Sequence, residues 1–154
     1  MRTFQCTHCQ SLVFFDDSLC VQCGHALGFD PQAMAMRAVA PGESLRFCRN
    51  HADHRACNFL VTPGDPDDYC VSCRQTRVIP NLSTPGNLRH WITIEKAKRR
   101  LYYTLARLGL EEGVHDGAGV ETPAYEFLED VPGEPPVMTG HANGLITINL
   151  SEAD

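Results

Sequence analysis

The chain has 154 residues, and its 43% hydrophobic and 21% charged content is typical of a folded protein rather than a disordered one. No apolar run approaches the roughly 18 residues of a membrane span, and the first residues lack the apolar segment of a secretory signal. The formal net charge of −6 gives no overall electrostatic support for nucleic-acid binding. We therefore expect a cytoplasmic protein, with no membrane partner, in a compartment that keeps thiols reduced.

All eight cysteines lie between positions 6 and 73, and this clustering indicates metal binding rather than scattered core thiols. The first four follow the pattern Cys6-x2-Cys9-x10-Cys20-x2-Cys23. A two-residue spacing lets a tight turn bring two sulfurs to one ion, and two such turns complete a tetrahedral zinc site. A redox C-x-x-C pair would explain one of these turns but not both.

The second group of cysteines has a less regular spacing, Cys48-x8-Cys57-x12-Cys70-x2-Cys73. Its second half is another C-x-x-C turn, whereas its first half is stretched. We predict a second four-cysteine site, because a wide loop is closed at little extra entropic cost. His51 makes Cys48-x2-His51 a competing pair, so replacement of one cysteine by His51 stays open.

Both predicted sites are closed, since four protein ligands leave no coordination position for water or substrate. We therefore expect two structural Zn²⁺ ions that hold the fold and perform no chemistry. Structural zinc contributes on the order of 10–16 kcal/mol of apparent binding energy to folding. Chelation is expected to unfold this half of the chain.

Between the zinc ligands, a strand is expected at residues 12–15, and residues 24–47 are expected to link the two quartets. The clearest helix is predicted at 85–108, with Thr84 as N-cap, Pro85 at the first helical position and Gly109 as the stop. Its predicted buried face consists of Leu88, Trp91, Ile92, Leu101, Tyr102, Leu105 and Leu108.

The other face of this helix is basic and is expected to be exposed. It carries Lys96, Lys98, Arg99, Arg100 and Arg107, with Glu95 as the single acid. Such a face is either simply solvated or a contact for a phosphate backbone or an acidic partner. A protein or peptide partner is expected for the ribbons, and a nucleic acid through this basic face is the alternative.

A loop is expected at residues 109–119, followed by strands at 124–128, 137–141 and 145–150. Asn143-Gly144 is a strong hairpin turn signal. The predicted fold class is a small zinc-stabilised α+β protein, in which two zinc ribbons precede one long helix and a small, mostly antiparallel sheet. The predicted divisions are 1–28 for the first ribbon, 29–82 for a linker and second ribbon, and 83–154 for the helix and sheet.

The chain resembles the N-terminal portion of bacterial zinc-binding metallopeptidases that begin with a double zinc ribbon. The resemblance covers essentially every residue, and several motifs carry it. These are Phe4-Gln5-Cys6-Thr7-His8-Cys9, Cys57-Asn58-Phe59-Leu60-Val61, Thr76-Arg77-Val78-Ile79-Pro80-Asn81-Leu82-Ser83, Asn87-Leu88-Arg89-His90-Trp91, Val137-Met138-Thr139-Gly140-His141 and Gly144-Leu145-Ile146-Thr147-Ile148-Asn149-Leu150-Ser151-Glu152-Ala153-Asp154.

The resemblance implies that residues 145–154 precede an active-site helix of the H-E-x-x-H type, whose histidines hold an open zinc and whose Glu is the general base. These 154 residues contain no such motif and no pair of histidines four positions apart. We therefore expect no catalytic residue here, no peptidase activity from this chain alone, and a fragment rather than a natural short form. His141 lies in a family segment, where a structural or solvated role is favoured over an active-site one.

Three functions follow from these patterns. The first is the ribbon region of a metallopeptidase, which positions a substrate or partner beside a hydrolytic domain. The second is a non-enzymatic module that binds protein or nucleic acid. The third is a folding scaffold that self-associates through an unpaired final strand.

Overall fold

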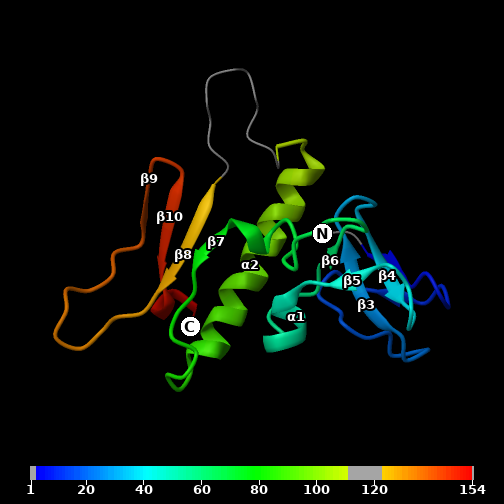
Figure 1. Ribbon diagram of the computed structural model, residues 1–154, viewed down its shortest axis with the longest axis horizontal. Coiled ribbons are helices and arrows are strands. Elements are labelled where there is room, and N and C mark those ends of the chain that lie inside the picture. The colour runs from blue at the N-terminus through cyan, green and yellow to red at the C-terminus, as the bar shows by residue number, and fades with distance from the viewer. Residues whose placement is uncertain (1–2, 111–122, 154) are drawn as a thin grey trace. The chain divides into compact units, whose positions relative to one another are not determined.

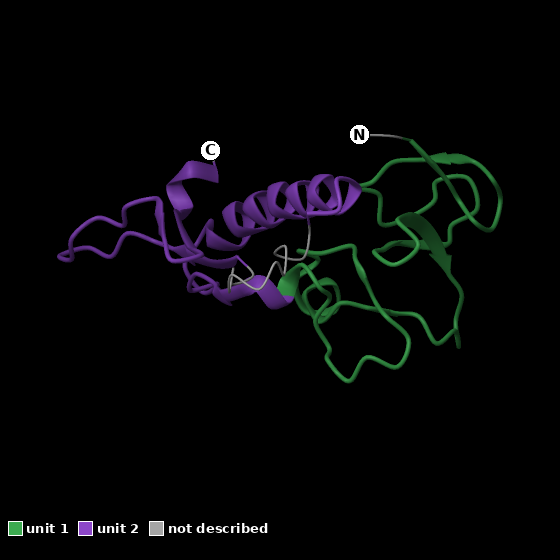
Figure 2. Ribbon diagram, turned by 90° about the horizontal axis from the view of Figure 1, so that it is seen from above, with its two compact units in different colours: residues 1–73 green, residues 74–154 purple. Residues whose placement is uncertain are grey.

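The computed structural model describes residues 3–110 and 123–153. The chain divides into two compact units, residues 1–73 and 74–154, which Figure 2 colours separately. The predicted loop at 109–119 lies almost entirely outside the described residues. The three-part domain division inferred from the sequence stays a prediction.

The first unit is built from short antiparallel strand pairs and one short helix, and Figure 1 labels β3 to β6 and α1. The pairs are β1 (Phe4–Gln5) with β2 (Leu12–Val13), β3 (Ala26–Asp30) with β4 (Ala35–Val39), and β5 (Arg46–Phe47) with β6 (Leu60–Val61). Helix α1 (Arg49–His54), which the sequence reading missed, lies between β5 and β6 in the chain. A 3₁₀ turn, η1 (Cys73–Gln75), closes this part of the chain.

Four phenylalanines form the centre of the first unit. Phe15 and Phe29 lie 4.9 Å apart between ring centroids, Phe29 and Phe59 4.8 Å, and Phe4 and Phe29 6.2 Å. All four rings are buried. Phe4 and Phe15 belong to the first ribbon, Phe29 lies between the two cysteine groups and Phe59 follows Cys57, so a single aromatic core serves both ribbons.

The segment expected to be a linker, residues 24–47, contains the central hairpin of this unit. Strands β3 and β4 pair from Ala26↔Val39 to Asp30↔Ala35. Phe29 also forms a bridge to Phe59, and its N–H donates to the Asn58 carbonyl at 2.8 Å. The hairpin therefore connects the two ribbons through packing as well as through the chain.

Gly28, in the middle of β3, supports a direct prediction about packing. A Cβ atom at this position would lie 2.4 Å from Leu60 Cδ2 and 3.0 Å from Phe47 Cε1. We expect Gly28→Ala to lower the free energy of unfolding by about 1–3 kcal/mol, the usual range for overpacking a core. Chemical denaturation checks this, with Gly140→Ala, which meets no atom within 4 Å, as the matched control. Equal losses in the two variants would contradict it.

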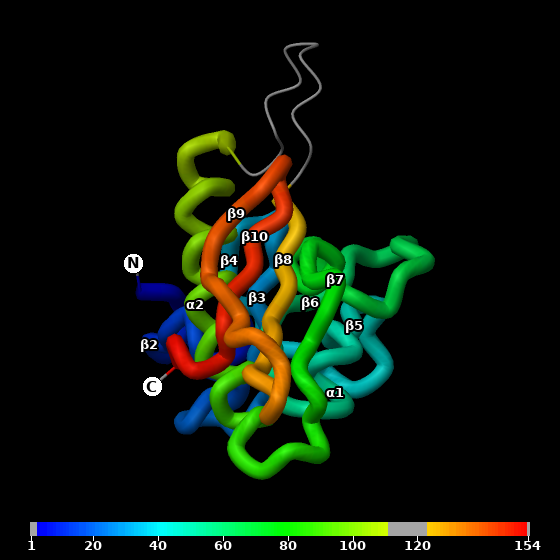
Figure 3. The backbone as a smooth tube through the Cα atoms, turned by 90° about the vertical axis from the view of Figure 1, so that its left-hand side faces the viewer, coloured from blue at the N-terminus to red at the C-terminus, as the bar shows by residue number. Residues whose placement is uncertain are grey.

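The second unit consists of one long helix and a four-stranded sheet. Its elements are β7 (Thr76–Val78), α2 (Asn87–Arg107), β8 (Ala124–Leu128), β9 (Gly140–Ala142), β10 (Leu145–Asn149) and the 3₁₀ turn η2 (Leu150–Ala153). The strand order is β7-β8-β10-β9, which Figure 3 displays side by side. The bounds of β8 agree with the predicted strand at 124–128.

The α+β class is confirmed, but this sheet is mixed rather than mostly antiparallel. Strand β8 pairs in parallel with both β7 and β10, and only β9–β10 is antiparallel. Helix α2 connects β7 to β8, and such a helical crossover is what a parallel neighbour requires. The final strand, β10, is paired on both sides, so the expected unpaired final strand is wrong.

Of three local sequence signals for turns and helix ends, two are confirmed and one is wrong. Asn143 and Gly144 have φ values of 49° and 80° between β9 and β10, which confirms the predicted hairpin turn. Gly109 has φ 69°, and its N–H donates to Ala106, which confirms the helix stop. The predicted N-cap is wrong, because α2 begins at Asn87 after Gly86 with φ 92° and not after Thr84.

The buried face of α2 differs from the predicted one. Trp91 is fully buried as expected, but Leu88, Leu101 and Leu108 are exposed. The buried positions are Asn87, Trp91, Ile94, Glu95, Lys98, Arg99 and Tyr103. Glu95, Lys98 and Arg99 are therefore not on a solvated face, which corrects the prediction for these three residues.

A buried ion pair explains this correction for two of the charges. Lys98 Nζ lies 3.0 Å from Glu95 Oε2, with side-chain exposures of 3% and 0%. The Thr76 hydroxyl donates to Glu95 and accepts from Lys98, and the ammonium lies 5.5 Å from the Tyr125 ring centroid. The pair thus connects α2 to β7 and β8. None of the described helices is long and apolar enough to cross a membrane.

Candidate metal centres

The first thiol cluster consists of Cys6, Cys9, Cys20 and Cys23, and the structure brings all four sulfurs within 4.8 Å of one another. Each C-x-x-C pair forms a tight turn. The Gln10 N–H donates to the Cys6 carbonyl at 2.9 Å, and the Gly24 N–H donates to the Cys20 carbonyl at 2.8 Å. Gly24 has φ 72°, a conformation that glycine adopts without strain.

The second thiol cluster consists of Cys48, Cys57, Cys70 and Cys73, which also lie within 4.8 Å of one another and are all buried. Different elements supply them. Cys48 lies between β5 and α1, Cys57 precedes β6, and Cys73 begins η1. The β5–β6 pairing, with Arg46 opposite Val61, draws the ends of the stretched first half together.

The sulfur separations distinguish a metal site from a disulfide. Cys6 and Cys23 sulfurs lie 3.8 Å apart, and Cys9 and Cys20 sulfurs 3.6 Å apart. In the second thiol cluster, the sulfurs of Cys57 and Cys70 lie 3.7 Å apart. A tetrahedron with 2.3 Å zinc–sulfur bonds has an edge of about 3.8 Å, whereas a disulfide bond is about 2.05 Å long.

Backbone amides orient the sulfurs of the second thiol cluster. The N–H groups of Phe59, Cys70 and Cys73 donate to the sulfurs of Cys57, Cys48 and Cys70, each at 3.4 Å. Such bonds stabilise thiolates, because they offer positive hydrogen atoms to a negative sulfur. The polar surroundings of this cluster therefore match four bound thiolates.

The thiol pKa values reflect the crowding of the sulfurs. Burial raises the pKa of Cys57 and Cys70 well above the usual range. Hydrogen bonds from Cys57, Cys70 and Cys73 lower the pKa of Cys48, and those from Ser11 lower the pKa of Cys9 to about 6. A bound divalent cation deprotonates coordinating thiols outright, so it removes the cost of burying several together.

His51 does not join the second thiol cluster. Its ring stacks on Phe47 at 4.2 Å between centroids, and its Nδ1 lies 2.7 Å from the Cys57 carbonyl oxygen. His8 and His25 stack on each other at 3.8 Å rather than joining the first cluster. His141, on β9, is exposed.

Neither cluster is arranged for chemistry. Four sulfurs around one point complete a tetrahedron, and a catalytic zinc keeps one position for water or substrate. Within residues 3–110 and 123–153, these two clusters are the groups of three or more potential ligands close enough for one ion. The sequence analysis did not identify Arg46. It contacts residues 67 and 68 beside the second thiol cluster, and no sequence motif predicts a contact between segments so far apart.

Comparison with known protein families agrees with this geometry. Residues 3–84 match the zinc-ribbon domain family, and residues 87–154 match the family described as "Putative zinc-binding metallo-peptidase". The chain therefore belongs to the zinc-ribbon domain family, and its residues 87–154 are similar to this metallopeptidase family. The zinc-ribbon match and the two four-cysteine clusters are consistent with two structural zinc ions.

Similar proteins occur in mycobacteria. Proteins described as uncharacterized from Mycobacterium tuberculosis strain H37Rv, M. tuberculosis strain CDC 1551 and M. bovis are each 35% identical over 155 aligned residues. The alignment covers 100% of this chain and 44% of each relative, so the chain spans less than half the length of these curated proteins. No solved structure matches the chain significantly.

Proposed function

We propose that the eight cysteines hold two structural zinc ions and that the ribbons they form are a non-catalytic region of a zinc metallopeptidase. The observation that carries the proposal is the sulfur spacing of 3.6–3.8 Å in both thiol clusters. Cys6, Cys9, Cys20 and Cys23 bind the first ion. Cys48, Cys57, Cys70 and Cys73 bind the second, and the contact of His51 with the Cys57 carbonyl supports four sulfurs over a histidine ligand.

The peptidase part of the proposal rests on the match of residues 87–154 to the metallopeptidase family. In this proposal the ribbons present a protein or peptide to a hydrolytic site that these 154 residues do not supply, since they lack the H-E-x-x-H motif. The protein acts in the cytoplasm. Its eight cysteines form no disulfides, and a compartment that keeps thiols reduced leaves them available to bind zinc.

Two measurements on the purified chain test this proposal. X-ray absorption at the zinc edge should show four sulfur ligands at about 2.3 Å and no nitrogen or oxygen shell. A mixed sulfur and nitrogen shell would indicate that His51 is a ligand and would overturn the assignment. In a peptide-library cleavage assay, the 154 residues should show no zinc-dependent hydrolysis. Hydrolysis lost on chelation would overturn the non-catalytic role.

A second candidate function, nucleic-acid binding, uses a smaller surface than the sequence suggested. Lys96, Arg100 and Arg107 follow one another at spacings of four and seven along α2, so they share one side of the helix. Arg100 and Arg107 are exposed, whereas Lys98 and Arg99 are buried.

This candidate predicts salt-dependent binding of single-stranded or duplex oligonucleotides. Changing Lys96, Arg100 and Arg107 together to Ala should weaken the affinity at least tenfold. With fewer cations to neutralise phosphates, binding releases fewer counterions from the nucleic acid. Fluorescence anisotropy measures the affinity, with Arg37→Ala in the other unit as a control for the loss of a surface cation elsewhere. Absence of binding at low salt would reject this function.

A further inference from the structure

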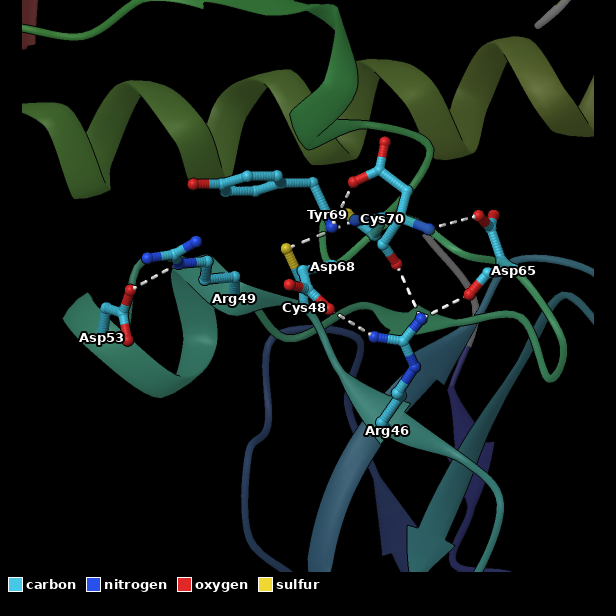
Figure 4. Close-up of polar contacts among 9 residues, drawn as sticks. Arg46, Cys48, Arg49, Asp53, Asp65, Asp68, Tyr69 and Cys70 are labelled. Carbon is cyan, nitrogen blue, oxygen red and sulfur yellow. Dashed lines mark hydrogen bonds and ion pairs between the residues drawn. The ribbon is translucent and has the colours of Figure 1, made fainter.

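Beside the second thiol cluster, one arginine joins two segments that each lead into a cysteine of that cluster. Arg46 lies two residues before Cys48, in strand β5. Its side chain reaches the acidic loop at residues 65–68, which lies just before Cys70 (Figure 4). The two segments are 22 residues apart in the sequence.

The guanidinium group uses both of its terminal nitrogens in this contact. Nη1 donates to Asp68 Oδ1 at 2.7 Å, and Nη2 donates to the Asp67 carbonyl at 2.8 Å and also to the Asp65 carbonyl. A planar fork of donors matches this convergence of one carboxylate and two carbonyls. A lysine, with one compact ammonium, could not make the same set.

The loop itself is shaped to offer these acceptors. The Asp67 N–H donates to Asp65 Oδ1 at 3.0 Å, and the Tyr69 N–H donates to Asp67 Oδ1 at 2.8 Å. These short side-chain turns aim the carbonyls of residues 65 and 67 toward Arg46. The loop therefore folds around the guanidinium group rather than merely passing near it.

A second bond attaches the same loop to the other side of Cys48. The Arg49 N–H donates to the Asp68 carbonyl at 2.8 Å. Two residues beyond this carbonyl, the Cys70 N–H donates to the Cys48 sulfur at 3.4 Å. The positions of Cys48 and Cys70 are thus coupled through residues on both sides of Cys48.

We propose that Arg46 is a positioning residue for the second zinc site, which holds the 65–68 loop so that Cys70 meets Cys48 at the metal. This inference rests on the proposed function, because it takes the second thiol cluster as a zinc site. The wide spacing of the cysteines at this site explains why a positioning residue is needed. No short turn joins Cys48 to Cys57 or Cys57 to Cys70, so a contact between distant segments fixes the geometry. The first thiol cluster, with two C-x-x-C turns, has no such requirement.

The test is the rate of zinc release from the whole chain to excess chromogenic chelator. Two release phases are expected, assigned to the sites with Cys9→Ser and Cys57→Ser. Arg46→Met should speed release from the second site by about 10–100-fold, the usual effect of losing a residue that orients metal ligands. Release from the first site should not change. Arg46→Lys should fall between wild type and Arg46→Met.

A milder variant and two control variants distinguish a local effect on the second site from general misfolding. Asp68→Ala removes the carboxylate but leaves both carbonyl contacts, so it should speed second-site release by less than Arg46→Met. Asp53→Ala breaks the exposed Arg49–Asp53 pair at 3.1 Å, and Arg37→Met breaks the Asp30 pair at 3.6 Å. Neither control should alter either phase.

The outcomes separate the two proposals. Two bound zinc ions with second-site release unchanged in Arg46→Met would overturn the role of Arg46 alone. Equal acceleration of both phases would also overturn it, since that would indicate general destabilisation. Fewer than two zinc ions in the wild-type chain would instead reject the proposed function.

Discussion

Removal of zinc by a high-affinity chelator is expected to unfold the first unit, residues 3–73. This unit contains short strand pairs and one six-residue helix, so local structure contributes little stability of its own. Each structural zinc contributes on the order of 10–16 kcal/mol of apparent binding energy at neutral pH. Without the zinc cations, nothing offsets the repulsion between sulfurs that lie 3.6–3.8 Å apart.

Methyl NMR signals from the buried side chains of Val13, Leu27 and Met36 measure this unfolding directly. They should collapse to random-coil positions on chelation and return when zinc is added back. The single tryptophan, Trp91, lies in the second unit, so its fluorescence follows that unit separately. Methyl signals that keep their folded positions after zinc has left would contradict the structural role of the ions.

The second large effect is expected from the buried ion pair of helix α2. Lys98→Met should lower the free energy of unfolding of the second unit by roughly 3–5 kcal/mol, because it removes the buried ammonium that pairs with the buried Glu95 carboxylate. Glu95 has no exposed surface, and Thr76 remains to donate one hydrogen bond. Urea denaturation followed by Trp91 fluorescence measures the loss.

A double variant separates the charge from the packing. Lys98→Met with Glu95→Met should recover most of the stability, since replacing both partners of a buried pair by apolar residues is often neutral or stabilising. Lys96→Met, two residues away and only half-buried, should change stability by no more than about 0.5 kcal/mol. A double variant less stable than Lys98→Met would show that the ion pair is not the source of the effect.

The sequence was most informative where spacing alone determines geometry. The C-x-x-C turns predicted the first thiol cluster, and Asn143-Gly144 predicted the β9–β10 turn, because few residue types adopt the backbone conformations that such turns need. The Schellman-type end of α2 at Gly109 followed from the same reasoning.

The sequence was least informative where tertiary contacts override local pattern. Strand β7 has three residues, too few for a periodic signal, so its parallel pairing with β8 could not be anticipated. Lys98 and Glu95 read as surface charges, because charged residues are seldom fully buried unless they are paired. The contact of Arg46 with the 65–68 loop joins segments far apart in the chain and leaves no local signature.

The central claim is that two four-cysteine sites each hold one structural zinc ion. The ratio of zinc to protein in the purified chain, measured by elemental analysis, tests it most directly. We predict two zinc ions per wild-type chain and one each in Cys9→Ser and Cys57→Ser. A ratio of one or less in the wild-type chain, or two ions retained in Cys57→Ser, would contradict the account.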